Sequence, residues 1–355
     1  TERLQHLLTD ATWDPQALDQ QRVRALVVQS PPQGLLVLDD TGLPKQGRAS
    51  VGVARQYSGT LGKIANCPVV VSAHYVADEP ASRAPVHWPL TAQLYLPEAW
   101  ATDRTRRTKV RVPAEVAFHT KPELALALVD QARAWGVPFA TVVTDAGYGD
   151  NPTFLHGLDG RQLRYVVGVS STFGVRLSAE VRAAMLVTPP RPRGRGKPHK
   201  PRPAPLYEAK AVLDALPAER WQAITWRAAA DTVLRKQFAA VRVHWATGGA
   251  QLSTSHHRVT TGPEGWLLGE RPLAGERGEV KWYYSNLPAD TPLQRLVEVA
   301  HSRWPIEQFY EDAKGECGLD HYQGRRWDGL HRHLALVMLA YSFLACQRWT
   351  PADLA

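Results

Sequence analysis

Two apolar runs that each end at an acid constrain the fold of this chain more than any other feature. Residues 34–38 read Gly-Leu-Leu-Val-Leu and stop at Asp39 and Asp40, and residues 139–144 stop at Asp145. Short apolar runs of this kind predict strands that are buried on both faces, as in sheets covered by helices. Ligand sites in such sheets lie beyond the carboxyl ends of the strands, so these acids are expected at one edge.

Helix and strand patterns alternate around the two runs. Thr120 and Glu123 have the spacing of a capping box, which opens a helix, and Gly136 closes it. A strand, a helix and a strand with short connections predict an α/β sheet. Further strands are expected at residues 68–75, 92–96 and 163–170, and the first two of these suggest a meander with the strand at 34–38.

The residue pattern changes between about residues 175 and 285. Strand-like runs at 241–245, 265–268 and 279–285 predict a β-rich insertion into the α/β core. The segment 189–205 is rich in Pro, Arg and Gly and has no acid, so no packed core can form from it. It predicts a basic loop that either contacts DNA or is merely solvated. Its cations include Arg191, Arg193, Arg195 and Lys197.

The formal net charge is +8, and the excess is arginine, with 32 Arg against 10 Lys. A basic balance favours a polyanionic partner, although a GC-rich genome also inflates the arginine content. The three cysteines form no CxxC pair, which excludes a disulfide framework and a zinc site of common spacing and fits a reducing cytoplasm. The longest apolar run, residues 334–346, is too short to span a bilayer. We therefore expect a buried helix, a cytoplasmic protein and no membrane partner.

The end of the chain is predicted to be helical, with a boundary or kink at Pro305. Arg303, Glu307 and Lys314 lie at steps of four and seven, so one helix face presents all three. The simplest alternative is an ordinary ion pair between Arg303 and Glu307. Glu311 lies on the same face and is a second candidate, but only Glu307 lies seven residues before Lys314.

Three acidic positions, namely Asp39 or Asp40, Asp145 and Glu307, are thus candidates for one site. Three hard oxygen donors suit Mg²⁺ or Mn²⁺. Two such ions can assist both the attacking and the leaving oxygen of a phosphodiester. Successive side chains of a strand face opposite ways, so Asp39 and Asp40 cannot both enter the site. A D-x-[ST] pattern favours Asp39, and a different alignment of the apolar run favours Asp40.

The residues around these acids carry a family resemblance. The segment from Arg303 to Lys314 looks like the R-x3-E-x6-K part of the YREK signature, and Asp145-Ala146-Gly147-Tyr148 is similar to a D-x-G-[FY] motif. Both belong to RNase H-like DDE transposases of cut-and-paste insertion sequences. Residues 39–67 and 315–344 resemble one branch of that family. The tyrosine of the signature falls at Ala300, so Tyr310 or no residue replaces it.

The resemblance implies an RNase H-like mixed sheet flanked by helices, with a β-rich insertion before the glutamate helix. It implies cleavage at transposon ends and strand transfer into target DNA, with Asp39 or Asp40, Asp145 and Glu307 holding two Mg²⁺ or Mn²⁺ ions. A homodimer acting on double-stranded DNA is also implied. The expected segments are 1–33, 34–174, 175–287 and 288–355.

Several further residues are candidates for DNA binding. Arg303 and Lys314 would bind phosphates, and Trp304 could stack on a displaced base. The remaining candidates are cations that lie after the first acid, in the basic loop, or before the last helix: Lys45, Arg48, Arg55, Lys63, Arg191, Arg193, Arg195, Lys197, Arg325 and Arg326. The alternatives to a transposase are a nuclease or domesticated relative that cuts without joining, a non-catalytic DNA-binding protein and, more distantly, a glycosidase.

Overall fold

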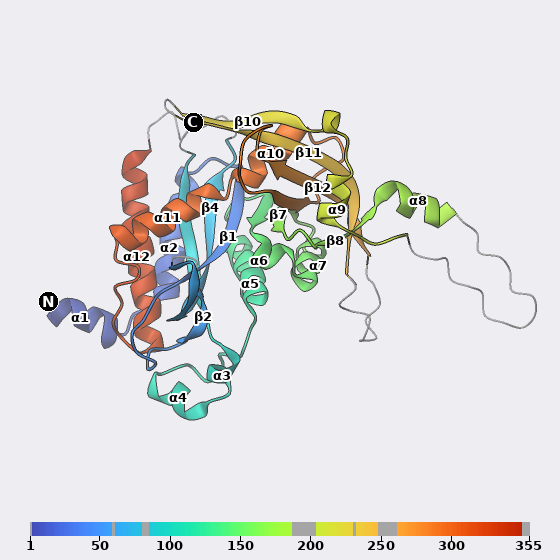
Figure 1. Cartoon of the computed structure of the whole chain (residues 1–355). Helices are drawn as coiled ribbons and strands as arrows, with labels where there is room; N and C mark the ends of the chain where they lie inside the picture. Colours follow the sequence, from blue (N-terminus) through green and yellow to red (C-terminus); the bar gives the residue numbers. More distant parts are fainter. Residues whose placement is uncertain are drawn as a thin grey trace, which may run out of the picture. The chain divides into compact units, whose positions relative to one another are not determined.

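The computed structural model describes residues 2–58, 61–79, 85–186, 204–229, 232–247 and 261–349 (Figure 1). The chain divides into two compact units. Unit 1 combines residues 1–143 and 302–355, and unit 2 comprises residues 144–301. The subdivision predicted from the sequence, with boundaries at 33, 174 and 287, stays a prediction. The Arg191, Arg193, Arg195 and Lys197 candidates lie outside the described residues.

Unit 1 is built on a mixed sheet in the order β5–β4–β1–β6. The strand β1 (Gly34–Gly42) is antiparallel to β4 (Val69–Ala77) and parallel to β6 (Thr141–Thr144). The strand β5 (His87–Tyr95) completes the predicted meander by pairing with β4. Nearly every residue of β1 and β4 is buried, as expected for strands with helices on both faces.

Helices cover both faces of this sheet. The helix α5 (Lys121–Ala134) begins at the predicted capping box, in which Thr120 and Glu123 bond reciprocally. Figure 1 shows α5 on one side of β1 and β4, and α11 (Trp304–Gly315) and α12 (Trp327–Arg348) on the other. The shorter helices α1, α2, α3 and α4 span Glu2–Thr9, Pro15–Gln29, Glu98–Ala101 and Arg104–Lys109.

The stretch after β1, for which the sequence predicts no helix or strand before residue 68, contains a β-hairpin. The strands β2 (Ala54–Ser58) and β3 (Lys63–Cys67) pair over five residues in a separate two-stranded sheet. The glycine at the end of β1, Gly42, packs closely against Ser58 and Cys67, where a Cβ would lie 3.1–3.2 Å from their side chains. A larger residue would therefore push the Ser58 and Cys67 side chains back by a few tenths of an ångström.

Unit 2 is an antiparallel sheet in the order β7–β13–β12–β11–β8–β9, with β10 beside β11. Three strands predicted in the insertion are present as β11, β12 and β13. The strands β7 to β13 span, in chain order, Arg164–Val169, Gly174–Leu177, Tyr207–Glu208, Gln222–Ala229, Thr232–Ala246, Thr261–Arg271 and Lys281–Ser285. The α-helices α6 to α10 span Ala146–Gly149, Pro152–Gly160, Ser178–Leu186, Ala209–Asp214 and Leu293–His301.

The helix α12 has the length and composition of a membrane span, and it is the one described helix that does. Half of its most apolar window is buried inside the structure. Its Ser342 accepts a hydrogen bond of 3.0 Å from the buried Arg22 of α2, which is paired with Asp19. Within unit 1, α12 therefore packs as a core helix, as predicted.

Candidate active site

The end of β1 presents its two neighbouring acids to opposite faces of the sheet. The Asp39 carboxylate lies 2.5 Å from the guanidinium of Arg303, which caps α11. The Asp40 carboxylate lies 3.0 and 3.2 Å from the ammonium of Lys121, the first residue of α5. The alternation of a strand thus separates the two acids, as predicted. Asp39 faces the helix that carries Glu307.

The helix α11 brings the predicted Arg-Glu-Lys face onto β1. Arg303 uses one guanidinium nitrogen for Asp39 and the other for Glu307, one helical turn further on. Lys314 donates a hydrogen bond of 2.7 Å to the hydroxyl of Thr41, which lies two residues after Asp39 on the same face of β1. This helix face therefore contacts β1 at two places, through Arg303 at Asp39 and through Lys314 at Thr41.

Pro305 sets the start of this helix and does not kink it. The preceding helix α10 ends at His301, and α11 begins at Trp304 with Pro305 in its first turn. Proline has no N–H to donate, and the first turn of a helix does not need one. The helix boundary predicted at this proline is confirmed, and Glu307 lies one turn inside it.

Tyr310 and Ser72 are buried next to Asp39 and are hydrogen-bonded to each other. Ser72 is the register partner of Asp39 on β4, and its hydroxyl lies 2.7 Å from the Tyr310 hydroxyl. Burial raises the pKa of Tyr310 well above its usual value, and the nearby Asp39 carboxylate raises it further. Tyr310 therefore stays protonated, and its hydroxyl is held inside the protein. The sequence suggests Tyr310 as a replacement for the signature tyrosine, whose position is Ala300 in this chain. A buried hydroxyl does not suit such a role in holding DNA.

The Asp39 and Glu307 carboxylates supply hard oxygen donors of the kind that Mg²⁺ and Mn²⁺ prefer. Both already converge on one cation, the Arg303 guanidinium, so this place favours positive charge. Across the part of the chain that the structure describes, no three His, Cys, Asp or Glu side chains form a metal-binding group. The residues present fit a cation between two acids, and a third acid has to come from elsewhere.

Asp145, the predicted third acid, belongs to unit 2. It follows β6 directly and caps α6, accepting a hydrogen bond of 3.0 Å from the Gly147 N–H. Val143 on β6 pairs with Val37 on β1, and Asp145 and Asp39 each lie two residues further along. Asp145 thus follows the end of β6, whereas Asp39 lies within β1, beyond the last pair that β1 forms with β6.

Apart from Arg303 and Lys314, the described residues that are predicted to bind DNA fall into two groups. Lys45 and Arg326 are bonded within unit 1: the Lys45 ammonium donates to the Tyr322 carbonyl, and the Arg326 guanidinium to the Thr9 carbonyl. Burial lowers the pKa of Lys45. DNA binding by these two cations would compete with their internal bonds. The side chains of Arg48, Arg55, Lys63, Trp304 and Arg325 are exposed.

Sequence reasoning missed three parts of this neighbourhood, namely Lys121 beside Asp40, the hydrogen bond between Lys314 and Thr41, and the hairpin β2–β3. The capping box of Thr120 and Glu123 placed Lys121 at the start of α5, but its ion pair joins it to a residue 81 positions away. The bond between Lys314 and Thr41 depends on packing between segments 273 residues apart, whereas the hairpin is local and its two strands are short.

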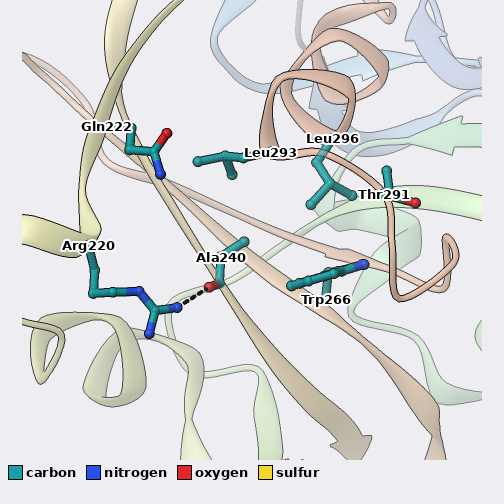
Figure 2. A pocket seen from close by; sticks show the side chains of 7 residues that line it. All are labelled: Arg220, Gln222, Ala240, Trp266, Thr291, Leu293 and Leu296. Atoms are coloured by element: carbon teal, nitrogen blue, oxygen red, sulfur yellow. Dashed lines mark hydrogen bonds between the residues drawn. The ribbon is translucent and has the colours of Figure 1, made fainter.

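Unit 2 contains a half-open pocket of about 130 Å³ (Figure 2). Trp266 forms one wall, and Leu293 and Leu296 of α10 form another. Arg220 lies at the edge, and its guanidinium donates a hydrogen bond of 3.1 Å to the Ala240 carbonyl. Gln222 and Thr291 complete the lining. None of the predicted acids takes part in this pocket.

Comparisons with known proteins cover a large part of the chain. The family model described as "DDE superfamily endonuclease" matches residues 1–232, a stretch that includes Asp39, Asp40 and Asp145 and ends before Glu307. A probable transposase for insertion sequence element IS701 from Microchaete diplosiphon is 30% identical over 177 residues. That alignment covers 49% of this chain and 42% of the relative. The mixed sheet flanked by helices is consistent with an RNase H-like DDE fold.

Proposed function

The chain belongs to the DDE superfamily of endonucleases, and on that premise we propose that it is the catalytic part of an insertion-sequence transposase. Its reactions would be cleavage at transposon ends and transfer of the freed strand into target DNA. In the first, water attacks a phosphodiester and releases a 3′ hydroxyl. In the second, this hydroxyl attacks a phosphodiester of the target. A homodimer on double-stranded DNA would pair the two ends.

The observation that carries this proposal is the junction of β1 and α11. One guanidinium, that of Arg303, holds Asp39 and Glu307 together although 264 residues separate Arg303 from Asp39. A simple surface ion pair between Arg303 and Glu307 would not include a strand-end acid. The third acid, Asp145, follows the parallel neighbour of β1 at the same offset as Asp39.

Endonucleases of this superfamily generally use divalent metal ions, and we propose two Mg²⁺ or Mn²⁺ ions held by Asp39, Asp145 and Glu307. Bound there, the ions would supply charge stabilisation at the phosphodiester and lower the pKa of the attacking water. Arg303 would orient a non-bridging phosphate oxygen, since a guanidinium matches phosphate geometry with two N–H groups. Lys314, fixed on Thr41, would hold a second phosphate of the same strand.

The test is cleavage by the Glu307→Gln variant. Glutamine keeps the size of the side chain but removes the charge, so we expect Mg²⁺-dependent nicking of a duplex carrying a transposon end to fall at least about 100-fold, or ~2.7 kcal/mol. DNA affinity should stay near the wild-type value. The matched control is Glu311→Gln, one turn further on and exposed, which should nick normally.

Two results would overturn parts of this proposal. Equal nicking by wild type and Glu307→Gln would remove the residue from the site. Cutting of the end by the wild-type chain without joining to target DNA would indicate a nuclease that does not transpose.

A further inference from the structure

One face of the hairpin β2–β3 exposes an aromatic and an aliphatic side chain beside a cation. Tyr57 and Ile64 are directly opposite each other on the two strands and are 63% and 59% exposed. Arg55, two residues before Tyr57, points to the same side and is also exposed. These three residues are called here the outer face of the hairpin. The other side packs inward through Ser58 and Cys67, which are fully buried.

The hairpin is held firmly at its base. The Gln56 amide donates a hydrogen bond of 2.8 Å to the Cys67 carbonyl, and the Asn66 amide donates bonds of 3.0 and 2.7 Å to the Lys45 and Gly47 carbonyls. An isolated two-stranded hairpin is only marginally stable in water, so these bonds and the buried side support it. The outer face is therefore an ordered part of unit 1.

The charge around the outer face suits a polyanion. Residues 41–77 contain no Asp or Glu. Arg48, Arg55 and Lys63 are exposed within this stretch. Arg325 is exposed beside it, since its carbonyl accepts a hydrogen bond of 3.0 Å from the Val51 N–H. A second copy of this chain would gain nothing from such a concentration of one charge, whereas duplex DNA would.

We infer that the outer face of the hairpin enters the major groove of the DNA bound at the candidate active site. A major groove admits a two-stranded ribbon, whose outward side chains then reach the base edges. Tyr57 and Ile64 make apolar contacts with the bases, thymine methyl groups included, and Arg55 binds a flanking phosphate. The inference rests on the proposed function for its partner.

The hairpin is close enough to the active site for one duplex to contact both. Ile64 lies eight residues before Ser72, the register partner of Asp39. At ~3.3 Å per residue the chain between them spans at most about 26 Å. This is less than one turn of B-DNA, about 34 Å. The contacted bases therefore lie within one helical turn of the scissile phosphate, and the hairpin reads the sequence next to the cut.

The test is photocrosslinking and DNA binding without Mg²⁺, so neither readout depends on cleavage. The probe is a duplex carrying the terminal sequence of the encoding element, with 5-iododeoxyuridine replacing one thymine at a time. We expect crosslinks to Tyr57 at positions within one turn of the cut, and none with Tyr57→Ala.

The Tyr57→Ala/Ile64→Ala variant should lose about tenfold in affinity for this duplex but not for unrelated DNA. Arg55→Gln should lower the salt dependence by about 0.9 in log–log slope.

Phe343→Ala is the matched control, because Phe343 is 64% exposed on α12 of the same unit. It should bind and crosslink as wild type does. Unchanged thermal midpoints for the hairpin variants would show that the fold is intact. The inference is overturned if Tyr57→Ala/Ile64→Ala binds the end as tightly as wild type, or if it loses self-association instead of DNA binding. A chain that crosslinks at Tyr57 but never cuts would overturn the proposed function and leave the hairpin contact standing.

Discussion

Asp39 and Asp40 are neighbours in the chain and yet lie in different environments. Each carboxylate is paired with a cation on a helix, Asp39 with Arg303 and Asp40 with Lys121. The guanidinium of Arg303 is shared with a second acid, Glu307, whereas the Lys121 ammonium pairs with Asp40. The comparison teaches that an ion pair at a strand end does not by itself indicate a catalytic site. Two acids that converge on one cation are the more informative arrangement.

The largest expected effect is the loss of DNA cleavage when Asp39, and not Asp40, is substituted. Asp39→Asn should lower Mg²⁺-dependent nicking at least about 100-fold, ~2.7 kcal/mol, because an amide binds a hard cation far more weakly than a carboxylate does. Asp40→Asn should stay within about threefold of wild type, less than 1 kcal/mol. Both rates are measured on the same end-containing duplex with saturating Mg²⁺. If the two variants were equally impaired, or if Asp40→Asn were the inactive one, the assignment of the two faces would be reversed or lost.

The sequence predicted those features of this region that depend on neighbours along the chain. The capping box at Thr120 and the helix boundary at Pro305 are local, since each involves residues at most a few positions apart. The choice between Asp39 and Asp40 stayed open because alternation says that they differ but not which helix covers which face. The bond from Arg303 to Asp39 spans 264 residues, and only the folded chain shows it.

The hairpin β2–β3 illustrates the opposite case, in which a short element gives little signal. Its strands have five residues each, and the outer face carries exposed Tyr57 and Ile64, so the alternation does not distinguish a strand from a polar loop. The cations nearby look alike in the sequence. Their environments differ because Lys45 reaches the backbone of Tyr322 while Arg55 points to solvent.

A smaller effect, on stability, is expected when Arg303 beside Asp39 or Lys121 beside Asp40 is replaced by an uncharged residue. Arg303→Met removes the guanidinium between Asp39 and Glu307, which should lower the free energy of unfolding by about 1 kcal/mol, since Glu307 is half exposed and can turn to water. Added Mg²⁺ should restore more stability to this variant than to wild type, because the ion replaces the guanidinium between the two acids. Thermal unfolding with and without MgCl₂ measures both quantities.

Lys121→Met is the control for the other face. It removes the ammonium beside Asp40, and a single carboxylate makes a poor site for a hard divalent ion. Its stability should therefore respond to MgCl₂ no more than that of the wild type. An equal Mg²⁺ response of the two variants would show that the convergence of Asp39 and Glu307 has no bearing on cation binding.

The smallest expected effect concerns Lys314, the cation that bonds to Thr41 on the Asp39 face. Burial lowers the pKa of Lys314 below its usual value of 10.5. Between the folded pKa and 10.5 the unfolded chain binds more protons at this residue than the folded chain, so its contribution to stability rises with pH. In Lys314→Met that contribution is absent, and the free energy of unfolding should fall more steeply, or rise less, towards alkaline pH than in wild type.

Denaturant titrations from pH 7 to 10 measure the difference. Parallel curves for the two proteins would show that the Lys314 ammonium is as well solvated as it is in the unfolded chain, and the Asp39 face would then lose the partly buried cation that distinguishes it.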